Sequence, residues 1–223
     1  MEKVSISKLI DFRNIEKQGP KLTFIRNLQK PKIENKGSGG DYWICGTSAS
    51  AAAFWNNDQT YLDDKIHELK EKIEATEYKR TKDQFQKNID IMVAMHEFDF
   101  DGISPGTELK KQTLKQNIVK FDTLPIQVRP QHIFSYEIDE KPNVGAVWLV
   151  AKKDGYKTSE LGMFATALYH CLKNGFSDNF AIDPDFCIAI DISTTKEVRY
   201  SNILKEEVPD ILKSTVSELL KLL

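Results

Sequence analysis

The stretch 59–97 contains neither glycine nor proline, the residues that most often interrupt a helix. Apolar side chains with helical spacing occupy its first half: Leu62, Ile66, Leu69 and Ile73. An uninterrupted helix of this length would measure about 58 Å, whereas a compact protein of this chain length is roughly 45 Å across. The sequence therefore predicts a long helix that either bends into a hairpin near Ala75 and Thr76 or projects from the body.

A projecting helix needs a partner for its apolar side chains, because an exposed apolar stripe is unfavourable in water. We favour packing of the second half of this helix within the chain. The four apolar residues of the first half are then the predicted partner-binding surface, in a homo-oligomer or a larger protein complex. The stripe spans less than two heptads, which is too short to predict a coiled coil.

The segment 1–36 is predicted to form two short helices and differs in charge from the rest of the chain. It has nine basic and four acidic side chains, a local charge of +5, whereas the whole chain has a net charge of −2. Its basic residues are the candidate contacts for nucleic acid: Lys8, Arg13, Lys17, Lys21, Arg26 and Lys30. Two interpretations stay open, a surface that binds an acidic partner and a solvated helix face without a target.

A helical region is predicted over 41–115, after the glycine-rich linker 35–40. The region begins with a buried helix, since the residues after Asp41 are apolar or small, and it ends with a short helix over 107–115. The linker lacks the Lys-Ser/Thr pair of a phosphate-binding loop, so nucleotide binding of that type is not expected.

The remainder, 118–223, has the pattern of a mixed sheet with flanking helices. The predicted strands are 118–121, 126–128, 133–138, 144–151, 186–192 and 197–200. Strand 144–151 is almost entirely apolar, so it should lie at the centre of the sheet with both faces covered. A crossover helix from Thr158 would make strand 186–192 parallel to it. The predicted class is α+β, with a helical N-terminal half, an αβββαβ-like core and a C-terminal helix.

The run Gly145-Ala-Val-Trp-Leu-Val-Ala-Lys152, followed by Leu161-Gly-Met-Phe-Ala-Thr-Ala-Leu168, looks like the third strand and following helix of the PD-(D/E)XK nucleases. With the element order over about 118–192, it resembles the core of that superfamily. The resemblance implies an Asp on the second strand and a Glu or Asp two residues before a Lys on the third. In such enzymes the carboxylates hold a divalent metal and the lysine orients the attacking water.

Lys152 matches the lysine of that family, but Val150 stands at the position of its acid. Because one metal ligand is missing, the resemblance implies a fold used for assembly or nucleic-acid contact, without a metal or cofactor. The expected aspartate would fall among Tyr136, Glu137 and Asp139. The alternative is a Mg²⁺-dependent DNA nuclease with atypically placed catalytic residues: Glu137, Asp139, Lys152 and Asp191.

Three further segments, 39–43, 124–128 and 186–191, look like parts of a set of uncharacterised bacterial proteins of similar length, a likeness that implies no activity. No apolar run is long enough to cross a membrane, and the three cysteines contain no CxxC pair. A cytoplasmic protein with reduced thiols is expected. The favoured hypothesis is a non-catalytic bacterial subunit for assembly or nucleic-acid association, in a defence or mobile-element system.

Overall fold

The computed structural model describes residues 3–30 and 42–223. The predicted linker 35–40 lies outside the described residues, as does part of the basic segment 1–36. The helices are α1 (Ile6–Arg13), α2 (Gln18–Gln29), α3 (Ile44–Asn56), α4 (Thr60–Ala75), α5 (Lys79–Met95), the 3-10 helix η1 (Asp101–Ile103), α6 (Thr158–Phe176), α7 (Tyr200–Leu204) and α8 (Leu212–Lys221). The strands are β1 (Val4–Ser5), β2 (Lys110–Lys111), β3 (Ile118–Phe121), β4 (Leu124–Gln127), β5 (His132–Ile138), β6 (Lys141–Val150), β7 (Ala181–Asp191) and β8 (Lys196–Arg199).

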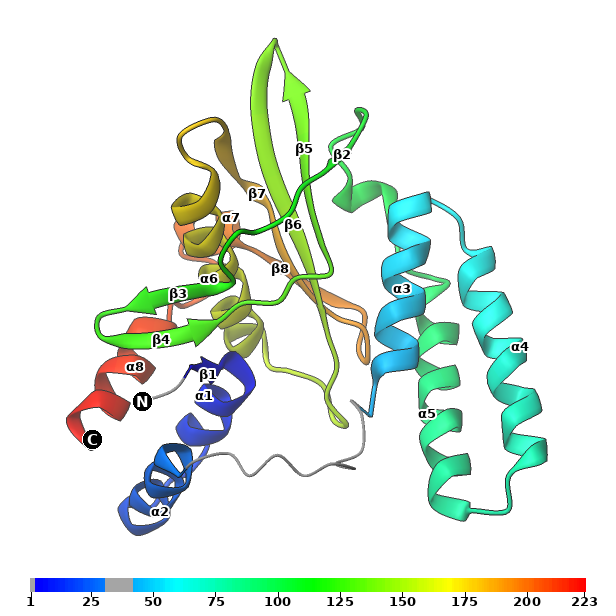
Figure 1. Cartoon of the computed structure of the whole chain (residues 1–223), viewed down its shortest axis with the longest axis horizontal. Helices are drawn as coiled ribbons and strands as arrows, with labels where there is room; N and C mark the ends of the chain where they lie inside the picture. The colour runs from blue at the N-terminus through cyan, green and yellow to red at the C-terminus, as the bar shows by residue number, and fades with distance from the viewer. Residues whose placement is uncertain (1–2, 31–41) are drawn as a thin grey trace.

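A mixed sheet with the strand order β2-β5-β6-β7-β8 forms the centre of the described chain (Figure 1). The β5–β6 pair is an antiparallel hairpin, and β6 and β7 are parallel and joined through α6. Both pairings were predicted from the sequence and are confirmed. The α+β class is confirmed as well, because the helical first half packs against this mixed sheet.

The sheet is covered on both faces, which explains why β6 is almost entirely apolar. Side chains alternate along the strand, so that Ala146 and Trp148 join the core beneath α6, whereas Val147 and Leu149 join the core beneath α3 and α5. Figure 1 shows the three helices α3, α4 and α5 together on one side of the sheet. A smaller sheet, with the order β1-β4-β3, lies near α1 and α8.

The predicted helix 59–97 is a hairpin of α4 and α5, with its bend next to the predicted break at Ala75 and Thr76. The apolar stripe of α4 faces inward: Leu62 and Leu69 are fully buried, Ile66 is buried, and Ile73 packs against the same core as α3 and α5. The prediction that these four residues bind a partner is therefore corrected, because they pack in the core that α4 shares with α3 and α5.

Leu69→Ala is expected to destabilise the fold by about 2–5 kcal/mol, because it opens a cavity in this packed core. Urea unfolding gives the free energy, and light scattering gives the molar mass before and after the change. Tyr78→Ala is the control, since Tyr78 is 78% exposed in the α4–α5 bend and should have little effect. A lowered molar mass with unchanged stability would instead assign Leu69 to an interface between chains.

The predicted helix 107–115 is wrong. This segment contains β2, whose residues Lys110 and Lys111 pair with Ser135 and Phe134 at the outer edge of β5. Helical propensity is a weak preference here, and pairing satisfies backbone groups that the edge of β5 would otherwise expose. Among the residues that the structure describes, no helix is both long and apolar enough to cross a membrane.

Candidate functional site

The structure does not bring the four predicted catalytic residues together. Glu137 lies opposite Pro142 at the turn end of the β5–β6 hairpin, whereas Lys152 follows the other end of β6. At about 3.3 Å per strand residue these positions are roughly 30 Å apart. Asp191 ends β7, opposite Val150, on the Lys152 side. An active site that joins Glu137 or Asp139 to Lys152 and Asp191 is therefore contradicted.

Asp139 has a role in the hairpin turn. Its φ is 49° and that of Glu140 is 62°, so both residues are left-handed, as the two central positions of a type I′ turn require. Aspartate is one of the few residues with a side chain that tolerates this conformation well. The presence of an aspartate at position 139 is therefore explained by the two-residue turn between β5 and β6.

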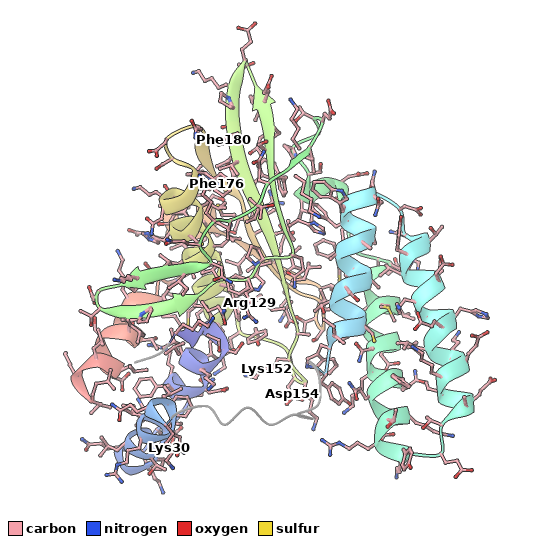
Figure 2. All side chains as sticks on the ribbon, viewed as in Figure 1. Lys30, Arg129, Lys152, Asp154, Phe176 and Phe180 are labelled. Atoms are coloured by element: carbon pink, nitrogen blue, oxygen red, sulfur yellow. The ribbon has the colours of Figure 1, made fainter. Side chains whose placement is uncertain are left out.

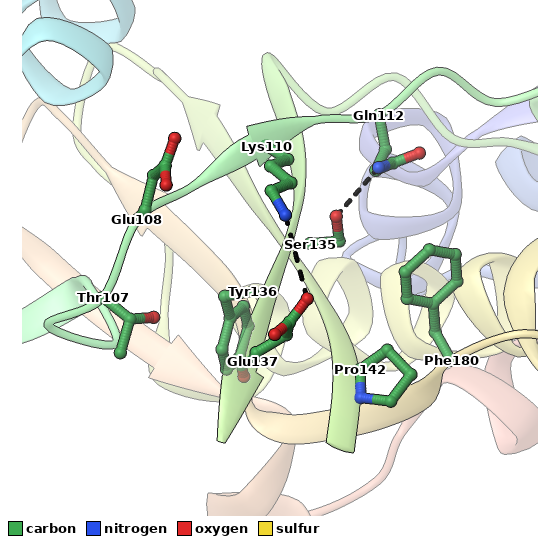
Figure 3. A pocket seen from close by; sticks show the side chains of 9 residues that line it. All are labelled: Thr107, Glu108, Lys110, Gln112, Ser135, Tyr136, Glu137, Pro142 and Phe180. Atoms are coloured by element: carbon green, nitrogen blue, oxygen red, sulfur yellow. Dashed lines mark hydrogen bonds and ion pairs between the residues drawn. The ribbon is translucent and has the colours of Figure 1, made fainter. Parts of the chain in front are cut away.

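Glu137 lines a cavity of about 410 Å³ at this end of the sheet, shown in Figure 3. Its carboxylate is exposed and lies 3.7 Å from Lys110 Nζ, and Gln112 donates a hydrogen bond to Ser135 Oγ at 2.8 Å. The Tyr136 hydroxyl donates to Asp183 at 2.7 Å, and burial together with this carboxylate raises the pKa of Tyr136. The phenol therefore stays protonated, and these contacts join β5 to the β2 segment and to β7.

Asp191 is fully buried and its carboxylate fastens two loops. One oxygen accepts the backbone N–H of Ser193 at 2.9 Å. The other accepts the N–H of Tyr156 at 2.7 Å and the hydroxyl of Thr194 at 2.9 Å. Asp191 thus lies at the carboxyl edge of the sheet and has buried partners as well. With three donors directed at it, this carboxylate is committed to the loops after β6 and β7.

Among the described residues, the acid paired with Lys152 is Glu160 in the first turn of α6, which sequence reasoning missed. Lys152 Nζ lies 4.0 Å from Glu160 Oε2 and 5.4 Å from the centre of the Tyr156 ring. The buried Glu160 carboxylate also accepts from Asn14 Nδ2 at 2.8 Å and from the N–H of Lys157 at 3.0 Å. A Glu in the first turn of a predicted helix is the available signal, but it indicates a helix cap rather than a ligand.

Asp191 of β7 is already engaged by three donors, so a further acid beside Lys152 would come from the beginning of β5, which runs antiparallel to β6. That position is occupied by Gln131, whose amide donates to Leu149 O at 3.1 Å and accepts from Leu149 N at 2.7 Å. The neutral amide of Gln131 thus hydrogen-bonds the backbone of β6 at a place where a metal site would need a carboxylate. Over residues 3–30 and 42–223, no group of three or more His, Cys, Asp or Glu side chains could hold a metal ion.

The end of β6 instead borders a cavity of about 430 Å³, which we call the β6 cavity. The residues that line it are Ser5, Ile6, Ser7, Trp43, Thr47, Gln127, Arg129, Gln131, Trp148, Leu149, Val150, Ala151, Tyr156 and Phe164. None of these described residues is acidic. The cavity combines aromatic rings, amides and hydroxyls with one arginine, and Figure 2 shows Arg129 and Lys152 toward the same end of the sheet.

Two cations converge beside this cavity on one neutral oxygen. In the amide orientation that satisfies its hydrogen bonds, Gln127 Oε1 accepts from Arg129 Nε and Nη2, both at 2.9 Å, and from Lys3 Nζ at 3.2 Å. An amide oxygen orients the two side chains without neutralising them, so the positive potential remains available to an anion. Sequence reasoning included Lys3 only as one basic residue of the segment 1–36 and missed Gln127 and Arg129. The parallel pairing of β1 with β4 is what brings Lys3 to them.

The predicted basic residues of α1 and α2 divide into two groups. Arg13 donates to Thr215 Oγ1 at 3.0 Å, and Lys21 forms an ion pair with Glu218, so both hold α8. The other four are exposed and hold no other helix in the described residues: Lys8, Lys17, Arg26 and Lys30. Lys30 donates to Asn27 Oδ1 within α2. Five of the six predicted residues are exposed, and Arg13 and Lys21 are engaged in contacts with α8.

Comparison with known proteins finds no match for the chain among protein-family models, curated sequences or solved structures.

Proposed function

We propose that this protein is a non-catalytic nucleic-acid-binding subunit whose contact surface surrounds the carboxyl end of β6. The observation that carries the proposal is the convergence of Lys3 and Arg129 on the neutral Gln127 amide, beside a cavity without acidic lining residues. Over residues 3–30 and 42–223 neither cation has an ion pair with a carboxylate. Such cations suit the phosphates of a nucleic acid, and guanidinium groups bind them in bidentate geometry.

The surroundings support the same proposal. Lys152 lies near Tyr156, a lining residue of the β6 cavity, and Lys153 and Lys157 are exposed in the same loop. Aromatic rings beside cations are typical of proteins that bind single strands, since bases stack on the rings while cations follow the backbone. Metal-dependent cleavage is less well supported, because Glu160 is the single acid paired with Lys152 among the described residues and Asp191 is held by three donors.

Arg129→Gln is expected to weaken binding of a fluorescein-labelled single-stranded oligonucleotide about tenfold, the loss expected for one charge-assisted phosphate contact. Fluorescence anisotropy over a series of salt concentrations measures the affinity. The slope of the logarithm of the binding constant against the logarithm of the salt concentration should become shallower by the amount expected for about one phosphate contact. Lys141→Gln makes the same charge change at the other end of β6 and serves as the control. Equal effects of the two variants, or affinity that is independent of salt, would refute the proposal.

A further inference from the structure

The β6 cavity has the dimensions of a site for one small ligand. Its volume of about 430 Å³ lies in the lower part of the range of roughly 300–1,000 Å³ that small-molecule sites occupy. Trp148 and Phe164 are 8% and 2% exposed, so their rings lie deep in the wall, whereas Arg129 is exposed. A hollow of this size takes one unit of a polymer, and the rest of a strand would stay outside.

The deep part of the cavity suits a flat heteroaromatic ring. Trp148 and Tyr156 both pack edge-on against Phe164, with ring centres 5.1 and 5.3 Å away, so these three rings form one aromatic wall. Aromatic side chains hold nucleobases of any sequence, because every base presents a π-face. The Ser7 hydroxyl and the Tyr156 hydroxyl, 3.5 Å apart, add polar groups beside this wall.

Arg129, which lines the cavity, and Lys3, which lies beside it, suit a phosphate with two charges. Lys3 and Arg129 both donate to Gln127 Oε1, so the two cations lie close together and repel each other. A phosphate monoester carries nearly two negative charges at pH 7, whereas a phosphodiester inside a strand carries one. Two adjacent cations therefore match the monoester better than the diester.

We infer that the β6 cavity binds a single nucleotide bearing a phosphate monoester, with the phosphate at Lys3 and Arg129 and the base against Trp148 and Phe164. The inference rests on the proposed function and narrows it from nucleic acid in general to a phosphorylated strand end. A free nucleoside monophosphate presents the same chemistry, so the experiment must separate these two sources.

Fluorescence anisotropy with the full chain provides the test. One labelled single-stranded oligonucleotide is prepared with a 5′-phosphate, with a 3′-phosphate and with hydroxyl groups at both ends. We expect one of the phosphorylated forms to bind at least tenfold more tightly than the unphosphorylated form. Competition with a nucleoside monophosphate, ribose 5-phosphate and inorganic phosphate then identifies which parts of the nucleotide are bound.

Two variants locate the effect. Arg129→Gln should abolish the preference for the phosphorylated end, and Gln127→Glu should do the same, because the new carboxylate pairs with Lys3 and Arg129 and repels phosphate. Lys141→Gln should retain the preference. Circular dichroism melting of each variant checks that it is folded, and Gln127→Glu, with its two new ion pairs, keeps the inference testable if Arg129→Gln is unstable.

Each outcome has a defined meaning. The inference is supported if the nucleoside monophosphate displaces the oligonucleotide at a concentration at least tenfold lower than ribose 5-phosphate requires. If the monophosphate also binds more tightly than the phosphorylated strand end, the free monophosphate is the ligand. Equal competition by inorganic phosphate refutes the base-binding part. Equal binding of all three oligonucleotides, weakened by Arg129→Gln, refutes this inference and leaves the proposed function intact. Absence of binding to every oligonucleotide refutes the proposed function instead.

Discussion

Gly145→Ala is expected to destabilise the protein by about 3 kcal/mol, the upper end of the usual effect of overpacking. Gly145 lies in β6, where the pairing with β7 shifts register between Val144 and Ala146. A Cβ atom there would lie 2.6 Å from Phe186 Cβ and 2.7 Å from the Phe186 carbonyl oxygen. Because one of these atoms belongs to the backbone of the neighbouring strand, the two central strands would have to separate locally.

Urea unfolding of the variant measures this loss. Gly19→Ala is the matched control: no heavy atom lies within 4 Å of a Cβ at Gly19 in α2, so alanine should stabilise that helix by up to about 1 kcal/mol. Equal stability of the Gly145 variant and the natural protein would show that β6 and β7 are not packed as described.

Asp191→Ala is expected to cost about 3 kcal/mol or more, since it leaves buried donors from both loops without an acceptor. Asp191→Asn should lower the free energy of unfolding by less, because the amide side chain has a similar shape and retains one acceptor oxygen. Thermal and urea unfolding in the absence of divalent metal measure both values. A metal ligand would give the opposite result, because removing a carboxylate from an empty metal site relieves repulsion.

Asp154→Ala is the control for this comparison. Asp154 is exposed in the same loop as Tyr156, so its removal should change stability by less than about 0.5 kcal/mol. If Asp191→Ala were as mild as Asp154→Ala, Asp191 would not be what holds the loops after β6 and β7, and its role as a ligand would have to be reconsidered.

Local patterns predicted most of the elements. The apolar run of β6 identified the central strand, and the spacing of Leu62, Ile66 and Leu69 identified α4, because both depend on burial that repeats along the chain. The element that covers each buried side chain was not predictable in the same way. The α4 stripe has the same spacing whether its partner is another chain or α5, and the choice depends on where the bend at 76–78 directs the second helix.

The site was harder to predict than the fold, because strand direction determines which residues meet. The sequence places Glu137 fifteen positions before Lys152, but the antiparallel pairing of β5 with β6 sends them to opposite ends of the sheet. The same pairing brings Gln131 beside Leu149. Lys3 and Arg129 come from distant segments, so no spacing rule could have joined them.

The packing of α1 on α8 has a consequence for biosynthesis. Arg13 reaches Thr215 across a separation of 202 residues, and α1 follows directly after β1, which begins at the residue after Lys3. Contacts between segments so distant along the chain form late. A nascent chain could therefore complete its central sheet before α1 packs on α8, and the proposed ligand site, which includes residues of α1, would form after that sheet.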